Sequence, residues 1–154
     1  TRVGDWEGDT VVSKDHRPGL NTLVERKTGL VLMTKLLGNN GIATANVVER
    51  RLGSLPAQLR RTLTLDNGPE NSRWQQIEKA TGLRCFFANP YHSWERGTNE
   101  NTNGLIREYF PKRTDFGMIT DNEIAKVEHL LNSRPRKRLG YKTPLEVMSV
   151  ALQS

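Results

Sequence analysis

The first third of the chain consists of three short runs rich in β-branched and apolar residues, separated by turn residues. The runs cover residues 6–12, 21–26 and 30–37, and the turns contain His16-Arg17-Pro18-Gly19 and Lys27-Thr28-Gly29. Runs of this length between Gly and Pro residues are typical of β-strands. Because such short connections join antiparallel neighbours, we predict a three-stranded antiparallel meander.

From residue 40 the spacing of apolar residues changes to the period of a helix. Gly53 and Pro56 end this pattern. Four apolar residues share the predicted buried face, namely Ile42, Ala45, Val48 and Leu52. We therefore predict one helix after the three strands.

The middle of the chain then alternates strand and helix patterns. Strands are expected over residues 62–65 and 83–88. Residues 72–75, Ser-Arg-Trp-Gln, match a capping box that opens a helix ending at Gly82. This helix runs through Trp74, Ile77 and Ala80.

The last third is helical, with breaks at Pro111 and Pro135. Residues 120–123 and 143–146 match capping boxes, the second with Pro144 at the first helical position. The helix after the first box is predicted to carry inward Ile124, Val127, Leu130 and Leu131. The order is βββαβαβααα, which matches the α/β ribonuclease H-like fold, a five-stranded mixed sheet flanked by helices.

The size and charge of the chain limit its organisation and partners. With 154 residues and 17.5 kDa, it is large enough for one hydrophobic core, so we expect a single domain. Lys and Arg number 23 against 17 Asp and Glu, which gives a net charge of +6 and a pI of about 9.8. Excess positive charge favours polyanionic partners, although a solubilising surface gives the same imbalance.

A single cysteine, Cys85, excludes an intramolecular disulfide and a Cys-rich zinc site, which favours an intracellular protein. Its neighbours Phe86 and Phe87 indicate a buried thiol. No segment approaches the roughly 20 apolar residues of a membrane span, and no signal peptide opens the chain. The chain begins with Thr1 rather than Met, which suggests a fragment of something longer.

Three acidic residues occupy positions where a carboxylate needs an explanation. Asp9 lies in a β-branched run, in a strand that this fold places mid-sheet, where a buried acid requires an ion pair, a raised pKa or a bound cation. Asp66 ends the fourth predicted strand, a common place for ligands, although Asp66-Asn67-Gly68 also suits an ordinary turn. Glu100 lies in the polar start of a helix, where the helix N-terminus alone favours an acid.

Together, the strand-borne Asp9, the strand-end Asp66 and the helical Glu100 favour a metal site. Three converging carboxylates would repel one another without cations. Mg²⁺ and Mn²⁺ suit hard oxygen ligands and keep open positions for water and phosphate. We therefore predict a divalent-metal site formed by these three acids.

Several motifs give the chain a resemblance to the DDE transposases and retroviral integrases, and within them to the insertion-sequence-thirty family (IS-thirty). The spacing agrees, because 33 residues separate Asp66 from Glu100. The matching segments are Trp6-Glu7-Gly8-Asp9-Thr10, Leu65-Asp66-Asn67-Gly68-Pro69-Glu70, Trp94-Glu95-Arg96-Gly97-Thr98-Asn99-Glu100-Asn101-Thr102-Asn103-Gly104, Tyr109-Phe110-Pro111-Lys112 and Leu131-Asn132-Ser133-Arg134-Pro135-Arg136-Lys137.

This resemblance implies a polynucleotidyl transferase and endonuclease. Asp9, Asp66 and Glu100 would bind two Mg²⁺ (or Mn²⁺) ions. Attack by water would free a 3′-hydroxyl at the transposon end, and that hydroxyl would then attack target DNA. No covalent enzyme intermediate is required.

The resemblance also implies a context for the chain. Residues 1–154 would form one catalytic domain, without the family's N-terminal helix-turn-helix region, and would act on DNA in the bacterial cytoplasm, away from membranes. Because two DNA ends must be paired, the active complex is expected to be a homodimer or larger. Two alternatives remain open, namely a ribonuclease H-like nuclease that only hydrolyses and a non-catalytic DNA-binding module.

Further polar residues are candidate DNA contacts. Arg107 follows Glu100 by two helical turns, so it is a candidate phosphate contact beside the metals, or else a solvated arginine. Asn103 can orient a metal-bound water or the DNA strand, and Asn67 can bond phosphate or fix its turn. A basic segment without acids suits the DNA backbone or a solvated loop, and contains Arg134, Arg136, Lys137, Arg138 and Lys142.

Aromatic residues have less certain roles at this stage. Tyr91 and Trp94 flank His92 just before the helix of Glu100, where they can stack on an unpaired base or brace the loop. His92 is not expected to be catalytic, because metal-activated water makes a general base unnecessary. Trp6 and Trp74 are expected in the core.

Overall fold

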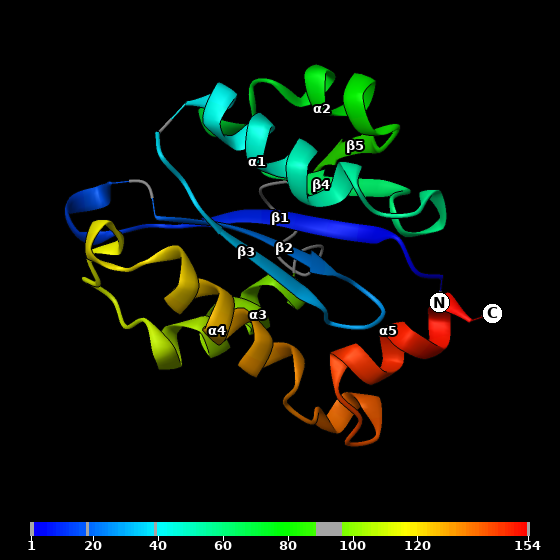
Figure 1. The fold of residues 1–154 in the computed structure, drawn as a ribbon. Coiled ribbons are helices and arrows are strands. Elements are labelled where there is room, and N and C mark those ends of the chain that lie inside the picture. Colours follow the sequence, from blue (N-terminus) through cyan, green and yellow to red (C-terminus); the bar gives the residue numbers. More distant parts are fainter. Residues whose placement is uncertain (1, 18, 39, 89–96, 154) are drawn as a thin grey trace.

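The computed structural model describes residues 2–17, 19–38, 40–88 and 97–153, and for 97–100 it describes the backbone alone. Within these ranges one mixed sheet has the strand order β3-β2-β1-β4-β5 (Figure 1). β2 is antiparallel to β1 and β3, whereas β4 is parallel to β1 and β5. The strands are β1 (Asp5–Val11), β2 (Leu20–Glu25), β3 (Val31–Lys35), β4 (Thr62–Leu65) and β5 (Arg84–Phe87). The predicted meander and both later strands are confirmed.

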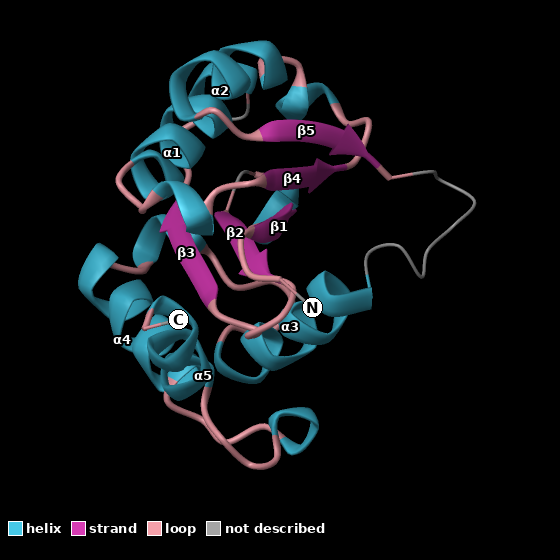
Figure 2. Cartoon of the chain, turned by 90° about the vertical axis from the view of Figure 1, so that its right-hand side faces the viewer, coloured by secondary structure: helices cyan, strands magenta, loops and turns pink. Residues whose placement is uncertain are grey.

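Helices cover both faces of this sheet. Figures 1 and 2 show α1 and α2 on one face and α3 and α4 on the other. The helices are α1 (Gly41–Gly53), α2 (Trp74–Thr81), α3 (Gly97–Tyr109), α4 (Asp121–Asn132) and α5 (Pro144–Leu152). The predicted order of strands and helices is therefore confirmed. In the described ranges, no helix combines the length and the apolar character needed to cross a membrane.

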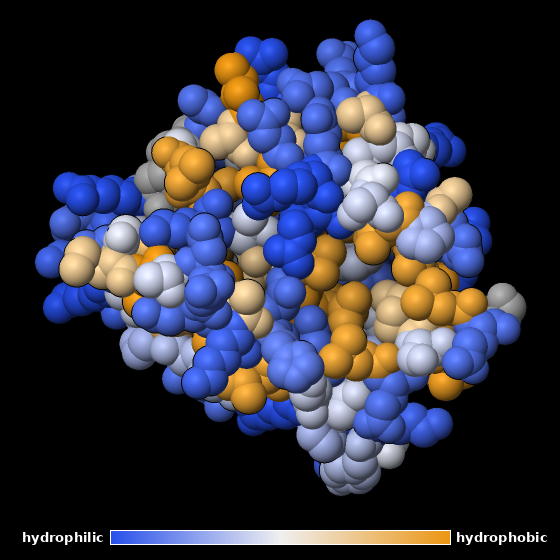
Figure 3. Space-filling model, viewed as in Figure 1, coloured by the Kyte–Doolittle hydropathy of each residue, from blue (hydrophilic) through white to orange (hydrophobic). Residues whose placement is uncertain are grey.

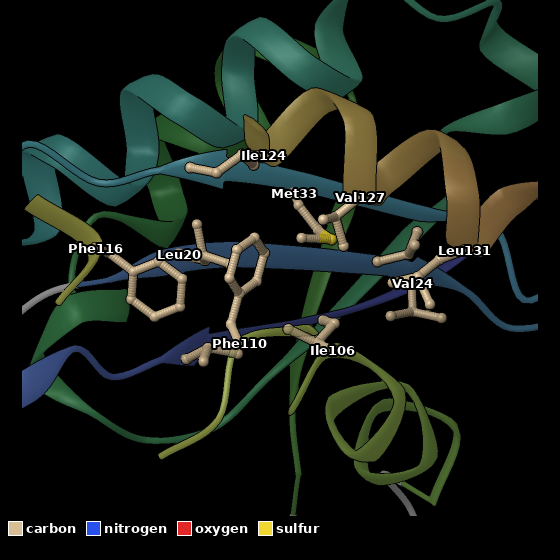
Figure 4. Close-up of a cluster of buried hydrophobic side chains, with 11 residues drawn as sticks. Leu20, Val24, Met33, Ile106, Phe110, Phe116, Ile124, Val127 and Leu131 are labelled. Atoms are coloured by element: carbon tan, nitrogen blue, oxygen red, sulfur yellow. The ribbon is translucent and has the colours of Figure 1, made fainter. Parts of the chain in front are cut away.

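Alternation along the strands sends apolar side chains into two cores, one on each face. Figure 4 shows the core beneath α3 and α4, where Leu20 and Val24 of β2 face Ile106 and Phe110 of α3. Its other members are Val11, Val31, Met33, Phe116, Ile124, Val127 and Leu131. The core beneath α1 and α2 contains Trp6, Leu23, Ala45, Val48, Leu52, Leu63, Leu65, Ile77 and Leu83. Trp74 packs against this second core, so both tryptophan predictions are confirmed.

The helix starts confirm one of the three predicted capping boxes in full and a second one in half. Thr143 and Glu146 form the full box of α5, and the Thr120 hydroxyl accepts a bond from the Glu123 N–H at the start of α4. The box at residues 72–75 is wrong. Ser72 has helical backbone angles (φ −65°, ψ −20°) because a 3-10 turn over Pro69–Asn71 leads directly into α2. An N-cap residue requires an extended backbone, so Ser72 cannot serve as one.

Two residues predicted to face inward are exposed instead. Ile42 and Leu130 are 47% and 41% exposed. Leu130 precedes the buried Leu131, and so points about 100° away from it around the helix. Ala80 of α2 is exposed as well. The spacing of apolar residues located the helices correctly but predicted buried faces that are wider than those in the structure.

Cys85 of β5 is half-buried, close to the prediction of a buried thiol. Its Sγ lies 3.8 Å from the Trp74 carbonyl oxygen. Burial, with a smaller contribution from the nearby Glu78 carboxylate, raises the pKa of the thiol to about 12. The thiol therefore stays protonated at neutral pH, which makes it a poor nucleophile.

Side chains from the helices occupy the outer edge of β3, which would otherwise expose backbone groups to other strands. Asn132 of α4 accepts from the Val31 N–H at 2.9 Å and donates to the Val31 carbonyl at 2.8 Å. The carboxylate of Glu128 accepts from the Met33 N–H at 2.7 Å. Arg51 of α1 donates to the Met33 carbonyl and also pairs with Glu128 at 2.7 Å. The edge strand is thus closed by polar side chains in place of a sixth strand.

We expect Asn132→Ala to lower the free energy of unfolding, because it leaves the N–H and the carbonyl of Val31 buried without partners. The expected loss is roughly 1–3 kcal/mol per group, measured by urea denaturation. Asn122→Ala, at an exposed position in the first turn of the same helix, is the control. Equal stability of the two variants would contradict the edge-closing role.

Candidate active site

Asp9 and Asp66 lie at the same end of two neighbouring strands, Asp9 within β1 and Asp66 directly after β4. β1 pairs with β4 in parallel, with Asp5 opposite Thr62 and Glu7 opposite Thr64. The same register, continued for two residues, would set Asp9 opposite Asp66, at the ~4.8 Å spacing of adjacent strands. Asp9 is two residues from Glu7 and Asp66 two residues from Thr64, so by the alternation of strands both carboxylates are expected on the face that carries α3. The register of the sheet therefore favours the predicted pair of aspartates.

Hydrogen bonds at both oxygens fix the Asp9 carboxylate. Its Oδ1 accepts from the Thr10 N–H at 2.9 Å, and its Oδ2 accepts from the Asn103 amide at 2.9 Å. Asn103 belongs to α3, so this helix binds directly to the acid on β1. Hydrogen bonds of this kind orient a carboxylate without preventing its oxygens from binding a cation.

Asp66 is held from its own turn. Its Oδ1 accepts from the Gly68 N–H at 2.8 Å and from the Asn71 amide at 2.9 Å. The same amide also donates to the Asp66 carbonyl at 3.1 Å. Asn71 is buried, and sequence analysis did not single it out. The sequence feature that could have indicated it is an amide residue five positions after the acid, beyond a Gly-Pro pair. The interpretation of residues 66–68 as a turn did not extend to that position.

The backbone of Glu100 lies in α3, and its side chain is outside the described residues. Glu100 precedes Asn103 by three positions, so the two lie on the same side of the helix, with Cβ atoms about 5–6 Å apart. Because Asn103 bonds to Asp9, α3 carries Glu100 to the same end of the sheet. Among the described residues, no group of three His, Cys, Asp or Glu side chains is placed to hold a metal ion. Glu100 therefore stays a predicted ligand. Tyr91, His92 and Trp94 lie outside the described residues.

The described groups fit a hard divalent cation. Two carboxylates on adjacent strands repel each other unless a cation lies near them, and oxygen donors are the ligands that Mg²⁺ prefers. The Asn103 side-chain oxygen is buried and accepts no hydrogen bond within the described part of the chain. The nitrogen of the same amide donates to Asp9. An oxygen atom that can bind a cation therefore lies close to that carboxylate.

A further acid, Glu7, is fully buried on the same face, two residues before Asp9. Its Oε2 lies 3.2 Å from the guanidinium of Arg26, which is half-exposed beyond the end of β2. This ion pair compensates the charge of Glu7. Sequence analysis quoted Glu7 only within a motif and did not anticipate its partner, because Arg26 comes from the hairpin at the opposite end of β1.

Known proteins that resemble this chain in sequence include transposases of insertion-sequence elements. The chain is 45% identical over 145 residues to the transposase for insertion sequence element IS4351 of Bacteroides fragilis, covering 94% of this chain and 44% of that protein. It is 42% identical over 146 residues to the transposase InsI for insertion sequence element IS30A of Escherichia coli (strain K12), covering 95% and 38%. The chain is homologous to insertion-sequence transposases over about 145 residues. It spans less than half the length of these relatives. No family model matches it.

Solved structures confirm the predicted ribonuclease H-like fold of this transposase homologue. The catalytic core domain of BIV integrase superposes with a TM-score of 0.68 at 19% identity, covering 94% of this chain and 92% of that one. A chain of the simian T-cell lymphotropic virus intasome, in complex with PP2A regulatory subunit B56 gamma, gives a TM-score of 0.73 at 20% identity, covering 94% and 54%. At such low identity these likenesses establish the fold alone.

In this chain, Arg107 joins α3 to the end of β1. Its guanidinium donates to the carbonyls of Phe110 and Pro111 at 3.3 and 3.2 Å, and to the carbonyl of Val12 at 3.1 Å. Burial lowers the pKa of Arg107 from its usual value. The side chain of Arg107 therefore has a structural role. Contact with phosphate stays a prediction, as it does for Asn67, which is exposed in the turn after β4.

The predicted basic segment lies at the other end of the sheet. Arg138 donates to the carbonyls of Arg26 and Lys27 in the β2–β3 hairpin, at 3.4 and 3.3 Å. Arg136 is half-buried and donates to the Leu131 carbonyl at 2.7 Å. Arg134 lies 3.5 Å from the Glu108 carboxylate. Two of these guanidinium groups thus stabilise the chain's own backbone, and binding of DNA by this segment, including Lys137, stays a prediction.

We expect Asn103→Ala to weaken binding of Mn²⁺ by roughly 10–100-fold, because Asp9 loses the partner that orients it. The electron paramagnetic resonance signal of free Mn²⁺ measures this affinity. Asn101→Ala, at an exposed position on the same helix, is the matched control. Equal losses in both variants would assign the effect to the helix, and an unchanged affinity in Asn103→Ala would contradict the positioning role.

Proposed function

We propose that this chain is the catalytic domain of a DNA transposase that cuts DNA at transposon ends and joins the freed 3′-hydroxyl to target DNA. The observation that carries the proposal is the parallel register of β1 with β4, which leads Asp9 and Asp66, both fixed by hydrogen bonds, to the same end of the sheet in a homologue of insertion-sequence transposases. In this proposal, a helix-turn-helix region precedes the domain in the whole protein, and two or more copies assemble on the DNA.

The residues of the site support in-line displacement at phosphorus. Such a reaction needs the attacking and leaving oxygens held on opposite sides of the phosphate, with little movement of the protein. Asn103 and Thr10 fix Asp9, while Asn71 and Gly68 fix Asp66, so neither carboxylate needs to reorganise. Divalent Mg²⁺ or Mn²⁺ ions held by Asp9, Asp66 and Glu100 would supply activation of the attacking oxygen and stabilisation of the leaving oxygen.

Strand joining exchanges one phosphodiester for another, so it is nearly isoenergetic and can be assayed in reverse without knowledge of the terminal repeat. We expect the chain with Mn²⁺ to reseal a fluorescein-labelled branched DNA, in which a free 3′-hydroxyl lies beside the branch point. The labelled strand then becomes longer on a denaturing gel. Asp66→Asn should reduce this activity by more than about 100-fold, since even residues that only orient metal ligands cost 10–100-fold.

Asp121→Asn is the control for this assay, because Asp121 is an exposed acid at the start of α4. A wild-type protein that hydrolyses an RNA–DNA hybrid but never lengthens the labelled strand would establish the ribonuclease H-like alternative. Binding of DNA without either reaction would establish a non-catalytic module.

Metal binding should also stabilise the fold, because the cation site requires β1, β4 and α3 to be assembled. At a metal concentration 100 times Kd the expected gain is about 2.7 kcal/mol. For a domain of this size that corresponds to a rise in Tm of roughly 5–10 °C. Differential scanning fluorimetry with Mn²⁺ measures the rise, and Asp66→Asn should lose most of it while Asp121→Asn keeps it. Identical shifts in all three proteins would show that these acids do not form the site.

A further inference from the structure

A second feature lies beyond the acids at the end of β1. The residues that follow this strand and the residues around the end of α3 enclose a pocket of about 630 Å³. We call it the β1–α3 pocket. Its charged and titratable lining residues are Lys14, Asp15, His16, Arg107, Lys112 and Arg113. Figure 1 shows the two segments together at the left of the molecule, and Figure 3 shows hydrophilic side chains over that side.

The pocket lies on the path that leads from the candidate active site. Val12, on its wall, is three residues beyond Asp9, which corresponds to about 10 Å along an extended strand. On α3, Arg107 follows Asn103 by one turn, and Asn103 binds Asp9. The pocket therefore lies within a few nucleotides of the acids along a strand of DNA.

The charge of the pocket suits an anion. Its lining contains four Lys or Arg residues and one Asp, an excess of three positive charges in a chain whose total is +6. Arg107 is engaged with carbonyl oxygens. By contrast, the ammonium groups of Lys14 and Lys112 are exposed and make no ion pair or hydrogen bond within the described part of the chain. These two cations are available to a ligand.

Hydrogen bonds between distant segments hold the walls of the pocket. The Ser13 hydroxyl accepts from the Phe116 N–H at 2.8 Å and donates to the Thr114 carbonyl at 3.2 Å, and the Lys14 N–H donates to the same carbonyl at 2.9 Å. Gly19 lies so close to Val11 that a Cβ atom there would overlap the Val11 carbonyl oxygen. The backbone that carries the two lysines is therefore held in place, so less conformational entropy is lost when a ligand binds.

The backbone around the pocket is strained. Asp15, His16 and Arg113 have φ values of 59°, 58° and 74°, in the left-handed region that residues with a Cβ rarely adopt. Among the described residues, Tyr141 is the one other non-glycine residue with positive φ. Each such residue costs on the order of 1–3 kcal/mol, and strain of this kind concentrates at functional sites. Three of the four strained positions thus coincide with one basic pocket.

We infer that the β1–α3 pocket binds a phosphodiester of the DNA strand whose reacting phosphate lies at Asp9 and Asp66. This inference rests on the proposed function and adds to it the residues that hold the DNA, with Lys14 and Lys112 as the phosphate-binding groups. Lys ammonium groups contact phosphate oxygens, which carry no sequence information, so recognition is of the backbone and independent of sequence. The bound strand is either the transposon end or the target.

The test compares Lys14→Ala/Lys112→Ala with Lys79→Ala/Lys126→Ala, a control with the same net charge and exposed positions on α2 and α4. Fluorescence anisotropy measures binding of a mixed-sequence fluorescein-labelled duplex at several KCl concentrations. Each lost phosphate contact reduces the steepness of the fall of log affinity with log salt by about 0.9. The slope should therefore be less steep by about 1.8 in the first variant and unchanged in the control. Affinity for Mn²⁺ should be unchanged in both.

Equal slopes in the two variants would overturn the inference while leaving the transposase proposal intact, provided that wild type reseals branched DNA. A wild-type protein that neither binds nor reseals DNA would overturn both. Branched DNA with either the transposon-end arm or the target arm shortened identifies the bound strand. If shortening removes the arm that the pocket binds, wild type and Lys14→Ala/Lys112→Ala should reseal that substrate at equal rates. If wild type stays faster than the variant on both shortened substrates, the pocket contacts neither arm.

Discussion

The parallel pairing of β1 with β4 is the constraint on which the candidate active site depends. Parallel neighbours place equivalent residues side by side, so one register decides whether Asp9 meets Asp66 or misses it. A shift of one residue would turn one carboxylate to the opposite face, into the core of Trp6 and Leu63. The apolar residues that alternate with the acids thus fix the position of the acids, because burial of Trp6 and Leu63 on one face is what holds both carboxylates on the other.

Helix α3 adds the second constraint, from the opposite side. Ile106 and Phe110 anchor it in the core, and Arg107 ties its end to the carbonyl of Val12. With the helix fixed at that end, Asn103 reaches Asp9 and the backbone of Glu100 lies one turn nearer the start of the helix. Packing in the core therefore determines which residues of α3 lie over the acids, and the polar contact determines how Asp9 is oriented.

Local pattern predicted what depends on neighbours in sequence. The strands, the helices and the positions of Asp9 and Asp66 followed from period and turn residues, because those signals act over a few residues. Asn71 was missed because its partner is known only once the 3-10 turn forms, and that same turn removed the predicted cap at Ser72. The closure of β3 by Asn132 joins residues 101 positions apart, which no local pattern records. The side chain of Glu100 lies outside the described residues, so its place in the site still rests on sequence.

Two basic regions show why charge density in sequence is a poor guide to where DNA binds. Residues 134–142 hold the densest cluster of cations, yet Arg136 and Arg138 donate to backbone carbonyls at the hairpin end of the sheet. Lys14 and Lys112 are 98 positions apart in sequence and line one pocket beyond Asp9. An Arg that already donates to carbonyls has fewer N–H groups left for a phosphate, whereas an exposed ammonium group that has no protein partner loses only water. The pocket beside the acids is therefore the better phosphate site, although sequence alone ranks it lower.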